Sequence, residues 1–278
     1  LVFFLYLFLY RFSKHMRFAS SVEYEGSNFF GWQRQSTVNS IQEEIENSLG
    51  KLLQSNIKIQ GSGRTDASVH ALGQVFHFDT DINRPTHSLV KGLNSFLPET
   101  IRIKWVKKVS HDFHARFSAI SREYQYLLYS SPINSSILLK HCGWTFYDLD
   151  FELIDVASKK FLGTHDFSAF RSSECQAKSA IRSVENITVD RFNNFYLFTI
   201  KADGFLHHQI RNMISTIIAV GRAKINPDYI ETLFLKKNRS LTPATFSPNG
   251  LYLTNIKYDK VWGLPDSLNT LNIFKMVT

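Results

Sequence analysis

A polar, glycine-punctuated stretch at residues 61–74, GSGRTDASVHALGQ, holds the side chains best suited to chemistry. Arg64, Thr65 and Asp66 follow one another within it, between small residues. A carboxylate with a cation two residues away suits a nucleophile or a general base that the arginine keeps ionised. The stretch lacks the Lys-Ser/Thr pair of a P-loop and the third glycine of a dinucleotide fingerprint. An aspartate in a glycine-rich turn also commonly bonds backbone N–H groups, so a purely structural role for Asp66 is the alternative.

The segments on either side predict the elements that position this stretch. Residues 57–60 and 75–78 are apolar and strand-like, so residues 61–74 are expected to form a loop between two strands. A helix is expected after Ser40, which forms a capping-box pattern with Glu43. Its apolar face would consist of Ile41, Ile45, Leu49 and Leu52.

The rest of the first half repeats this alternation of strands and helices. Strands are expected at residues 17–24 and 101–105, and a helix at residues 88–97. Residues 29–35 combine aromatic rings, amides such as Gln33 and a cation. Such a mixture can stack on a base and hydrogen-bond to it, although a packed aromatic loop is the commoner case. The order of elements predicts an α+β unit.

Two stretches of the second half could also contact a nucleic acid. Residues 122–129 alternate Tyr124, Tyr126 and Leu128 on one face of an expected strand, where an exposed tyrosine could stack on a base. A half-buried tyrosine in a sheet is more common. A long helix is expected at residues 205–220, and its first two turns carry His207, His208, Arg211 and Asn212. Cations there oppose the helix dipole, which favours another use. A groove that binds phosphate is one interpretation, and simple exposure to solvent is the alternative.

Composition limits the class of protein. The 278 residues are 44% hydrophobic and carry a net charge of +8, which favours an anionic partner and nucleic acid over membrane. Cys142 and Cys175 exclude a disulfide scaffold and fit a reducing cytoplasm. Two nearby histidines, His111 and His114, are too few for zinc, so no metal is expected.

The first fifteen residues differ from the rest of the chain. Residues 1–10 are apolar, but a membrane span needs about 20 such residues. Positive charge follows the apolar run, whereas a signal peptide has it before the run. We interpret residues 1–15 as a non-native or overextended start, with attachment to a lipid surface as the alternative.

Residues 61–74 resemble the catalytic motif GxGRTDxxVHAxGQ of the TruA family of tRNA pseudouridine synthases. Further blocks match that family in the same order over about residues 17–260. They lie at residues 24–35, 92–98, 113–117, 122–126, 163–167, 205–212 and 250–253.

This resemblance implies an isomerase that converts uridine to pseudouridine at positions 38, 39 and 40 of tRNA, in the anticodon stem-loop. No cofactor and no metal are implied. Asp66 would attack the target nucleotide, at its base or its sugar. Arg64 would pair with Asp66 and help to hold the RNA, and Tyr124 would stack on the target base. Further candidates for RNA contacts are Gln33, Arg116, Arg122, Arg211 and Asn212.

The fold implied is α+β, the pseudouridine synthase fold, with mixed or antiparallel sheets joined across a central RNA-binding cleft. Residues 16–110 would form the N-terminal half with the catalytic loop, and residues 111–265 the C-terminal half. Residues 266–278 would be a tail. The family acts as a homodimer that lays tRNA across both subunits, and a cytoplasmic location and no membrane contact are expected.

Two positions depart from the family pattern, because Ser62 stands where Ala is usual and Ser68 where Gly is usual. If residue 68 needs a positive φ, serine would cost roughly 1–2 kcal/mol there. Three alternative functions are a catalytically silent RNA-binding protein of the same fold, a synthase for other RNA positions, and a metal-dependent hydrolase. The hydrolase would use His111 and His114, or His207 and His208.

Overall fold

The structure is a computed structural model that describes residues 15–266 and 269–271. The apolar extension expected at residues 1–15 lies outside these residues except for His15. Within the part of the chain that is described, no helix is long and apolar enough to cross a membrane.

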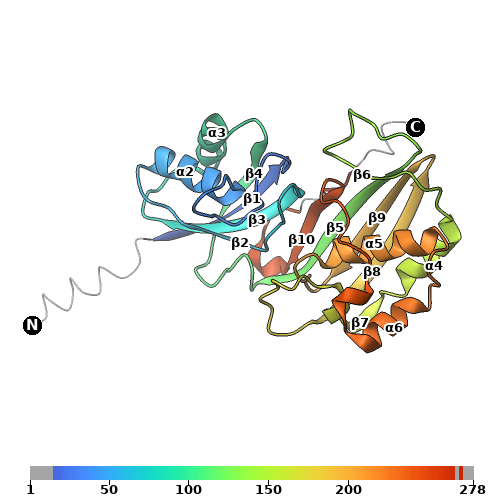
Figure 1. Ribbon diagram of the computed structural model, residues 1–278. Coiled ribbons are helices and arrows are strands. Elements are labelled where there is room, and N and C mark those ends of the chain that lie inside the picture. Colours follow the sequence, from blue (N-terminus) through green and yellow to red (C-terminus); the bar gives the residue numbers. More distant parts are fainter. Residues whose placement is uncertain (1–14, 267–268, 272–278) are drawn as a thin grey trace, which may run out of the picture.

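One mixed sheet runs through both halves of the molecule (Figure 1). Its main path is β4-β1-β3-β10-β5-β9-β8-β7, while β2 pairs with β3 and β6 pairs with β5. The strands are β1 (Met16–Tyr24), β2 (Ile59–Gly61), β3 (His70–Thr80), β4 (Ile101–Val109), β5 (Ala119–Ser130), β6 (Gly143–Thr145), β7 (Gly163–Asp166), β8 (Ile181–Phe192), β9 (Phe195–Ala202) and β10 (Leu251–Tyr258). The predicted α+β class with a mixed sheet is confirmed.

Strand β10 joins the two halves of the sheet. It runs parallel to β3, where Tyr252 and Leu253 pair with His70 and Ala71. On its other edge it runs antiparallel to β5, and Leu253 lies opposite Tyr124. A segment near the end of the chain therefore fixes the start of β3, next to the predicted catalytic loop, relative to β5.

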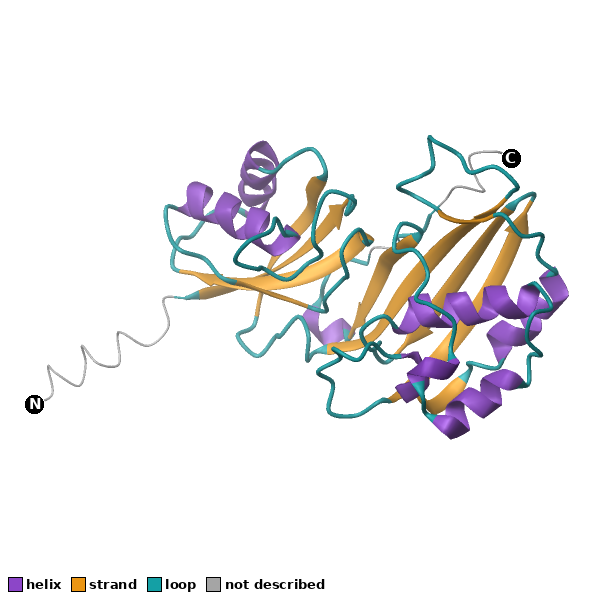
Figure 2. Cartoon of the chain, viewed as in Figure 1, coloured by secondary structure: helices purple, strands orange, loops and turns teal. Residues whose placement is uncertain are grey.

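The helices pack on the sheet in two groups (Figure 2). They are α2 (Ile41–Leu53), α3 (Thr86–Phe96), α4 (Phe151–Lys159), α5 (Gln209–Gly221) and α6 (Tyr229–Lys236). Short 3-10 helices are η1 (Phe167–Phe170), η2 (Arg239–Leu241) and η3 (Lys260–Trp262). Helices α2 and α3 belong to the N-terminal half, and α4, α5 and α6 belong to the C-terminal half.

Alternation along the strands separates a large core from two smaller ones. The large core lies between the helices and one face of the sheet, and it contains Tyr124, Tyr126 and Leu128 as predicted for that strand. The intervening Leu127 belongs to a smaller cluster on the other face with Cys142. Period-two burial of this kind follows from side chains that point to opposite faces of a strand.

Two elements next to the predicted site residues begin at other positions than the sequence-based expectation. Strand β3 begins at His70, because Ala71 and Gln74 pair with β1, so only residues 62–69 form the loop between β2 and β3. Helix α5 begins at Gln209 and not at residue 205, because His208 adopts φ 65°. The side chain of Gln209 also accepts the Leu206 N–H at 2.8 Å, which holds the chain in a turn before the helix.

The predicted cap of α2 is present. The Ser40 hydroxyl accepts the Glu43 N–H at 3.3 Å. The first helical N–H groups, of Ile41 and Gln42, donate to the carbonyls of Gly31 and Trp32 at 3.2 and 3.0 Å. The N-terminus of α2 thus anchors residues 31 and 32, which in turn contact the loop between β2 and β3.

Replacing Ser40 by Ala should lower the free energy of unfolding by about 1 kcal/mol, since a helix N–H loses its acceptor. Urea unfolding of the parent and the variant measures this difference. Ser36→Ala, at an exposed position, is the matched control. Equal unfolding midpoints for Ser40→Ala and the parent would contradict the role of the cap.

Candidate active site

The loop between β2 and β3 is held rigidly from several sides. The Thr65 hydroxyl shares a 2.8 Å hydrogen bond with the Tyr24 hydroxyl, and the Thr65 carbonyl accepts the Trp32 N–H at 3.1 Å. Gly31 adopts φ 88°, and a Cβ there would lie 2.5 Å from the Thr65 oxygen. Only glycine tolerates this approach. The tip of the loop therefore has a fixed position relative to β1 and α2.

The two departures from the family pattern have different structural consequences. Ser62 is buried and its hydroxyl donates to the Gln74 side-chain oxygen, while the Gln74 amide donates to the Gly63 carbonyl at 2.9 Å. The hydroxyl of Ser62 is therefore satisfied. Ser68 adopts φ 63°, so the positive φ considered for this position is present. A non-glycine residue there carries the conformational cost of the left-handed region.

Asp66 points from this loop toward the start of α5 and meets basic side chains there. Its Oδ2 lies 3.0 Å from Arg211 Nη1 and 3.5 Å from His208 Nε2, and its Oδ1 lies 3.3 Å from His207 Nε2. Burial disfavours the charged form, but the hydrogen bond from His207 and the charges of His208 and Arg211 outweigh it. The pKa of Asp66 is therefore lowered. The result is an ionised carboxylate that is 18% exposed.

A buried tyrosine lies in the same region. Tyr124 on β5 is 8% exposed, and its ring meets that of Phe205 edge to face with 5.2 Å between centroids. Burial raises the pKa of Tyr124, and the negative charge of Asp66 raises it further. The phenol is therefore neutral. No hydrogen bond of its hydroxyl is formed within the described residues.

Comparisons with known proteins identify the family of this chain. The family model described as tRNA pseudouridine synthase matches residues 21–118 and 157–259. The chain is 43% identical over 260 residues to tRNA pseudouridine synthase A of Nitrosomonas eutropha, covering 94% of this chain and 92% of that protein. It is 42% identical over 258 residues to the protein of the same name from Methylobacillus flagellatus, covering 93% and 99%.

The chain belongs to the tRNA pseudouridine synthase family. It is accordingly an isomerase of that family, as the sequence predicts. Among solved structures, a Cbf5-Nop10-Gar1 complex is similar with a TM-score of 0.36 and 14% identity. The match covers 85% of this chain and 48% of that chain, and it is too loose to carry an argument about the site.

Arg211, and not Arg64, pairs with the aspartate of the synthase. Arg64 is exposed and forms no ion pair within the described residues, so the expected Arg64–Asp66 pairing is corrected. The reason is local, because Thr65 is anchored inward by Tyr24 and the chain turns after Asp66, where the Val69 N–H donates to the Asp66 carbonyl. Arg64 and Asp66 consequently face different surroundings. Arg211 was expected to contact RNA and is instead 13% exposed beside Asp66.

Two other candidate RNA contacts have structural partners. The amide of Asn212 is buried, donates to the Phe170 carbonyl at 2.7 Å and accepts from Arg239 at 3.0 Å, so it is not available to RNA. The guanidinium of Arg122 donates to the carbonyls of Ser62, Arg116 and Asp203 at 3.1, 2.7 and 2.9 Å. It thereby ties the loop between β2 and β3 to the C-terminal half. Gln33 and Arg116 are exposed, as an RNA contact requires.

The contacts of His207 and His208 with Asp66 could not be assigned from the sequence. The available signal was the set of basic residues at the start of a helix, where they oppose the helix dipole. Their partner is the carboxylate of the catalytic loop. Ligand atoms of Asp66, His207 and His208 lie within 4.8 Å of one another, as a metal site requires. However, the Arg211 guanidinium already supplies positive charge to this carboxylate.

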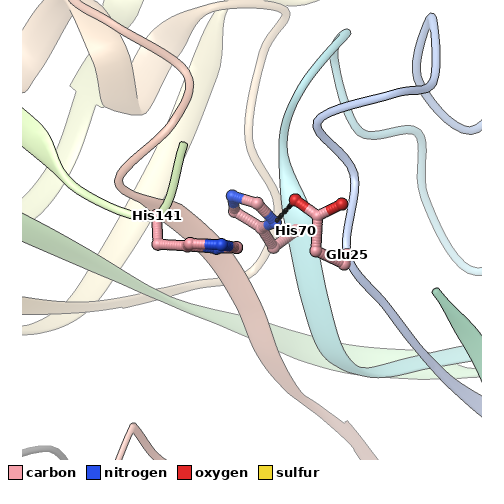
Figure 3. A group of neighbouring side chains, drawn as sticks. All are labelled: Glu25, His70 and His141. Atoms are coloured by element: carbon pink, nitrogen blue, oxygen red, sulfur yellow. Dashed lines mark ion pairs between the residues drawn. The ribbon is translucent and has the colours of Figure 1, made fainter. Parts of the chain in front are cut away.

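Glu25, His70 and His141 form a second group with metal-ligand atoms (Figure 3). The His70 Nδ1 lies 3.5 Å from Glu25 Oε1 and accepts the Gly26 N–H at 3.0 Å. Its Nε2 lies 2.9 and 3.1 Å from the carbonyls of residues 140 and 249, to which it donates. Both ring nitrogens are therefore in use. In this arrangement His70 links the start of β3 to two segments of the C-terminal half.

Replacing Arg211 by Gln should raise the pKa of Asp66, because only the histidines would then oppose the effect of burial. The part of the acid limb that protonation of Asp66 sets, which lies below the pH range of His207, should move to higher pH. The rate at neutral pH should fall about a hundredfold as the carboxylate loses its position. Isomerisation rates between pH 4.5 and 7.5 measure both effects.

Unfolding measurements test the same ion pair independently. Because the folded-state pKa of Asp66 lies below its unfolded value, the pair stabilises the fold above the unfolded pKa and loses this contribution as pH falls through the folded pKa. Arg211→Gln should reduce that acid-dependent loss. Lys224→Gln removes an exposed cation and is the control, and identical acid profiles for all three proteins would contradict the assignment.

Proposed function

We propose that this synthase converts uridine to pseudouridine at positions 38, 39 and 40 of tRNA, in the anticodon stem-loop, with Asp66 as the nucleophile. The observation that supports this role is the ionised Asp66 carboxylate, which Arg211 holds on a rigid loop. A nucleophilic carboxylate must be charged and must be fixed in position before the substrate arrives.

The reaction is an isomerisation that needs no external reactant. Asp66 attacks the target nucleotide at its base or its sugar, and the bond between N1 of uracil and C1′ of ribose breaks. The uracil turns, and its C5 forms a new bond to C1′. The proton leaves C5, and N1 carries a proton in the product, so the composition is unchanged. The carboxylate is released at the end of the cycle.

Access to the glycosidic bond requires the target nucleotide to leave its stack. Extrusion costs a few kcal/mol, and a base near a loop costs least. Stacking on an aromatic side chain can return roughly 1–3 kcal/mol. In our proposal Tyr124 provides this surface, and the edge-to-face contact with Phe205 keeps its ring from rotating.

Exposed cations near the loop would bind the RNA backbone. Arg64 and Arg116 are exposed, and Arg122 holds the Arg116 carbonyl close to that of Ser62, so residue 116 lies beside the catalytic loop. The net charge of +8 supports binding through phosphates. Gln33 is proposed as a further contact.

A homodimer that lays tRNA across both subunits and a cytoplasmic location complete the proposal. Sedimentation at micromolar concentration tests the dimer.

Replacing Asp66 by Asn should abolish turnover while tRNA binding persists, because the amide keeps the shape but not the nucleophile. Release of tritium from C5 of uridine in unmodified tRNA measures the reaction, and the rate should fall by about a thousandfold or more. Filter binding measures the affinity. Release by both proteins would overturn the role of Asp66.

The same assay distinguishes the alternative functions. Binding of tRNA without tritium release by the parent protein would indicate a catalytically silent RNA-binding protein. Transcripts in which the uridines at positions 38, 39 and 40 are replaced by cytidine should release no tritium. Undiminished release from these transcripts would indicate a synthase for other RNA positions.

Tyr124 is expected to act through its ring and not through its hydroxyl. Tyr124→Phe should retain kcat/KM within about threefold, whereas Tyr124→Leu should lower it by about tenfold to a hundredfold through lost stacking. Thermal unfolding of both variants controls for lost packing, because the side chain is buried. Equal effects of Phe and Leu at matched stability would contradict stacking.

A further inference from the structure

The two oxygens of Asp66 are held unequally. Arg211 and His208 both face Oδ2, at 3.0 and 3.5 Å. Within the described residues, Oδ1 is paired with His207 alone, at 3.3 Å from Nε2. Oδ2 is therefore shared between the Arg211 guanidinium and the His208 imidazole, while Oδ1 depends on a single imidazole.

Arg211, which contacts Oδ2, has a second side-chain anchor, whereas the ring of His207, which contacts Oδ1, does not within the described residues. Arg211 is 13% exposed, and its Nε donates to the Phe246 carbonyl at 2.8 Å. His207 precedes α5, its side chain is 37% exposed, and its backbone carbonyl accepts the Ser172 N–H at 2.9 Å. Within the part of the chain that is described, Asp66 is the ion-pairing partner of the His207 ring. Oδ1 is thus the oxygen that an arriving nucleotide can reach by moving one half-exposed ring.

We propose that His207 is a positioning residue that holds Oδ1 of Asp66 in the free enzyme and yields it to the target nucleotide. This inference rests on the proposed role of Asp66 as nucleophile. A protonated imidazole holds a carboxylate more strongly than a neutral one does, because a charge-assisted hydrogen bond is about twice as strong. The neutral form of His207 therefore releases Oδ1 more readily.

The charged groups around His207 set the pH at which this change occurs. The hydrogen bond and charge of Asp66 raise the pKa of His207, and Glu174 on the segment before β8 also raises it. Burial and the cation of Arg211 on α5 oppose the rise, and the neighbouring His208 ring lies 4.0 Å away. The pKa lies above the ordinary value. His207 is charged at acidic pH and loses its proton as pH rises, so catalysis should become faster across this range.

His208 provides a matched control on the same turn of the chain. It also contacts Asp66, but it shares Oδ2 with Arg211. Burial lowers the pKa of His208, so it is neutral where His207 still titrates. Removing either imidazole takes one contact from the Asp66 carboxylate. Only removal of His207 should change how the catalytic rate depends on pH above the ordinary pKa of histidine.

The experiment is a pH profile of single-turnover tritium release with saturating enzyme, from pH 5.5 to 8.5 at constant ionic strength. The parent rate should rise with pH through the pKa of His207 and then level off, because the neutral form of His207 releases Oδ1 more readily. His207→Gln keeps a neutral donor and should flatten the profile, with a rate above that of the parent at the acid end. His208→Gln should keep the parent slope.

Two results would overturn the role of His207. One is an unchanged slope in His207→Gln, and the other is a parent rate that falls as pH rises, which would indicate that the imidazolium binds RNA. The Asp66→Asn variant separates this inference from the proposed function. Activity in Asp66→Asn would overturn the nucleophile, whereas an inactive Asp66→Asn with an unchanged His207→Gln slope overturns only the positioning role.

A second measurement does not depend on the fold of a His207 variant. Titration of histidine-labelled protein by NMR should give a lower His207 pKa in Asp66→Asn than in the parent, because the carboxylate charge is removed. His208 should move less, since its contact is longer and burial dominates its pKa. An unchanged His207 pKa would show that the two side chains are not coupled in solution, which overturns the inference.

Discussion

The charge of one partly buried carboxylate is the constraint on which this structure depends. Asp66 lies on a loop of the N-terminal half, yet the cations that keep it ionised come from the start of α5 in the C-terminal half. Burial alone would favour the neutral acid. The two halves must therefore keep a fixed relation, and the continuous sheet through β10, the Arg122 contacts and the hydrogen bonds of His70 maintain it.

Local patterns in the sequence predicted much of the fold. The Ser40 cap, most of the α2 face and the alternation of Tyr124, Tyr126 and Leu128 depend on neighbouring residues and were found. At the end of α2, Leu53 is the buried leucine, and Leu52 is only partly buried. The ends of β3 and α5 were wrong, because pairing with β1 and β10 and the positive φ of His208 decided them. Long-range strand pairing and a positive φ at a single residue produce no periodic pattern of apolar residues, so the sequence pattern does not reveal them.

In the candidate site, too, contacts between distant parts of the chain could not be predicted from neighbouring residues. The residues Arg64 and Asp66 are close in sequence, so their pairing was the natural expectation. The true partner is Arg211, which is 145 residues away along the chain. Only the arrangement of the two halves brings it to the carboxylate. Asn212 was expected at the site because it follows Arg211 on the same helix. Its side chain is instead buried and bonds to Phe170 and Arg239.

The position of β10 has a consequence for synthesis on the ribosome. Residues 251–258 supply the strand between β3 and β5, so the nascent chain exposes the start of β3 and the facing edge of β5 until these residues have emerged. Contacts between residues so distant in sequence form late and slowly. A chain released early would therefore lack both the central strand and an assembled site. Incomplete copies of such a protein could be recognised by their unpaired edges before they ever met RNA.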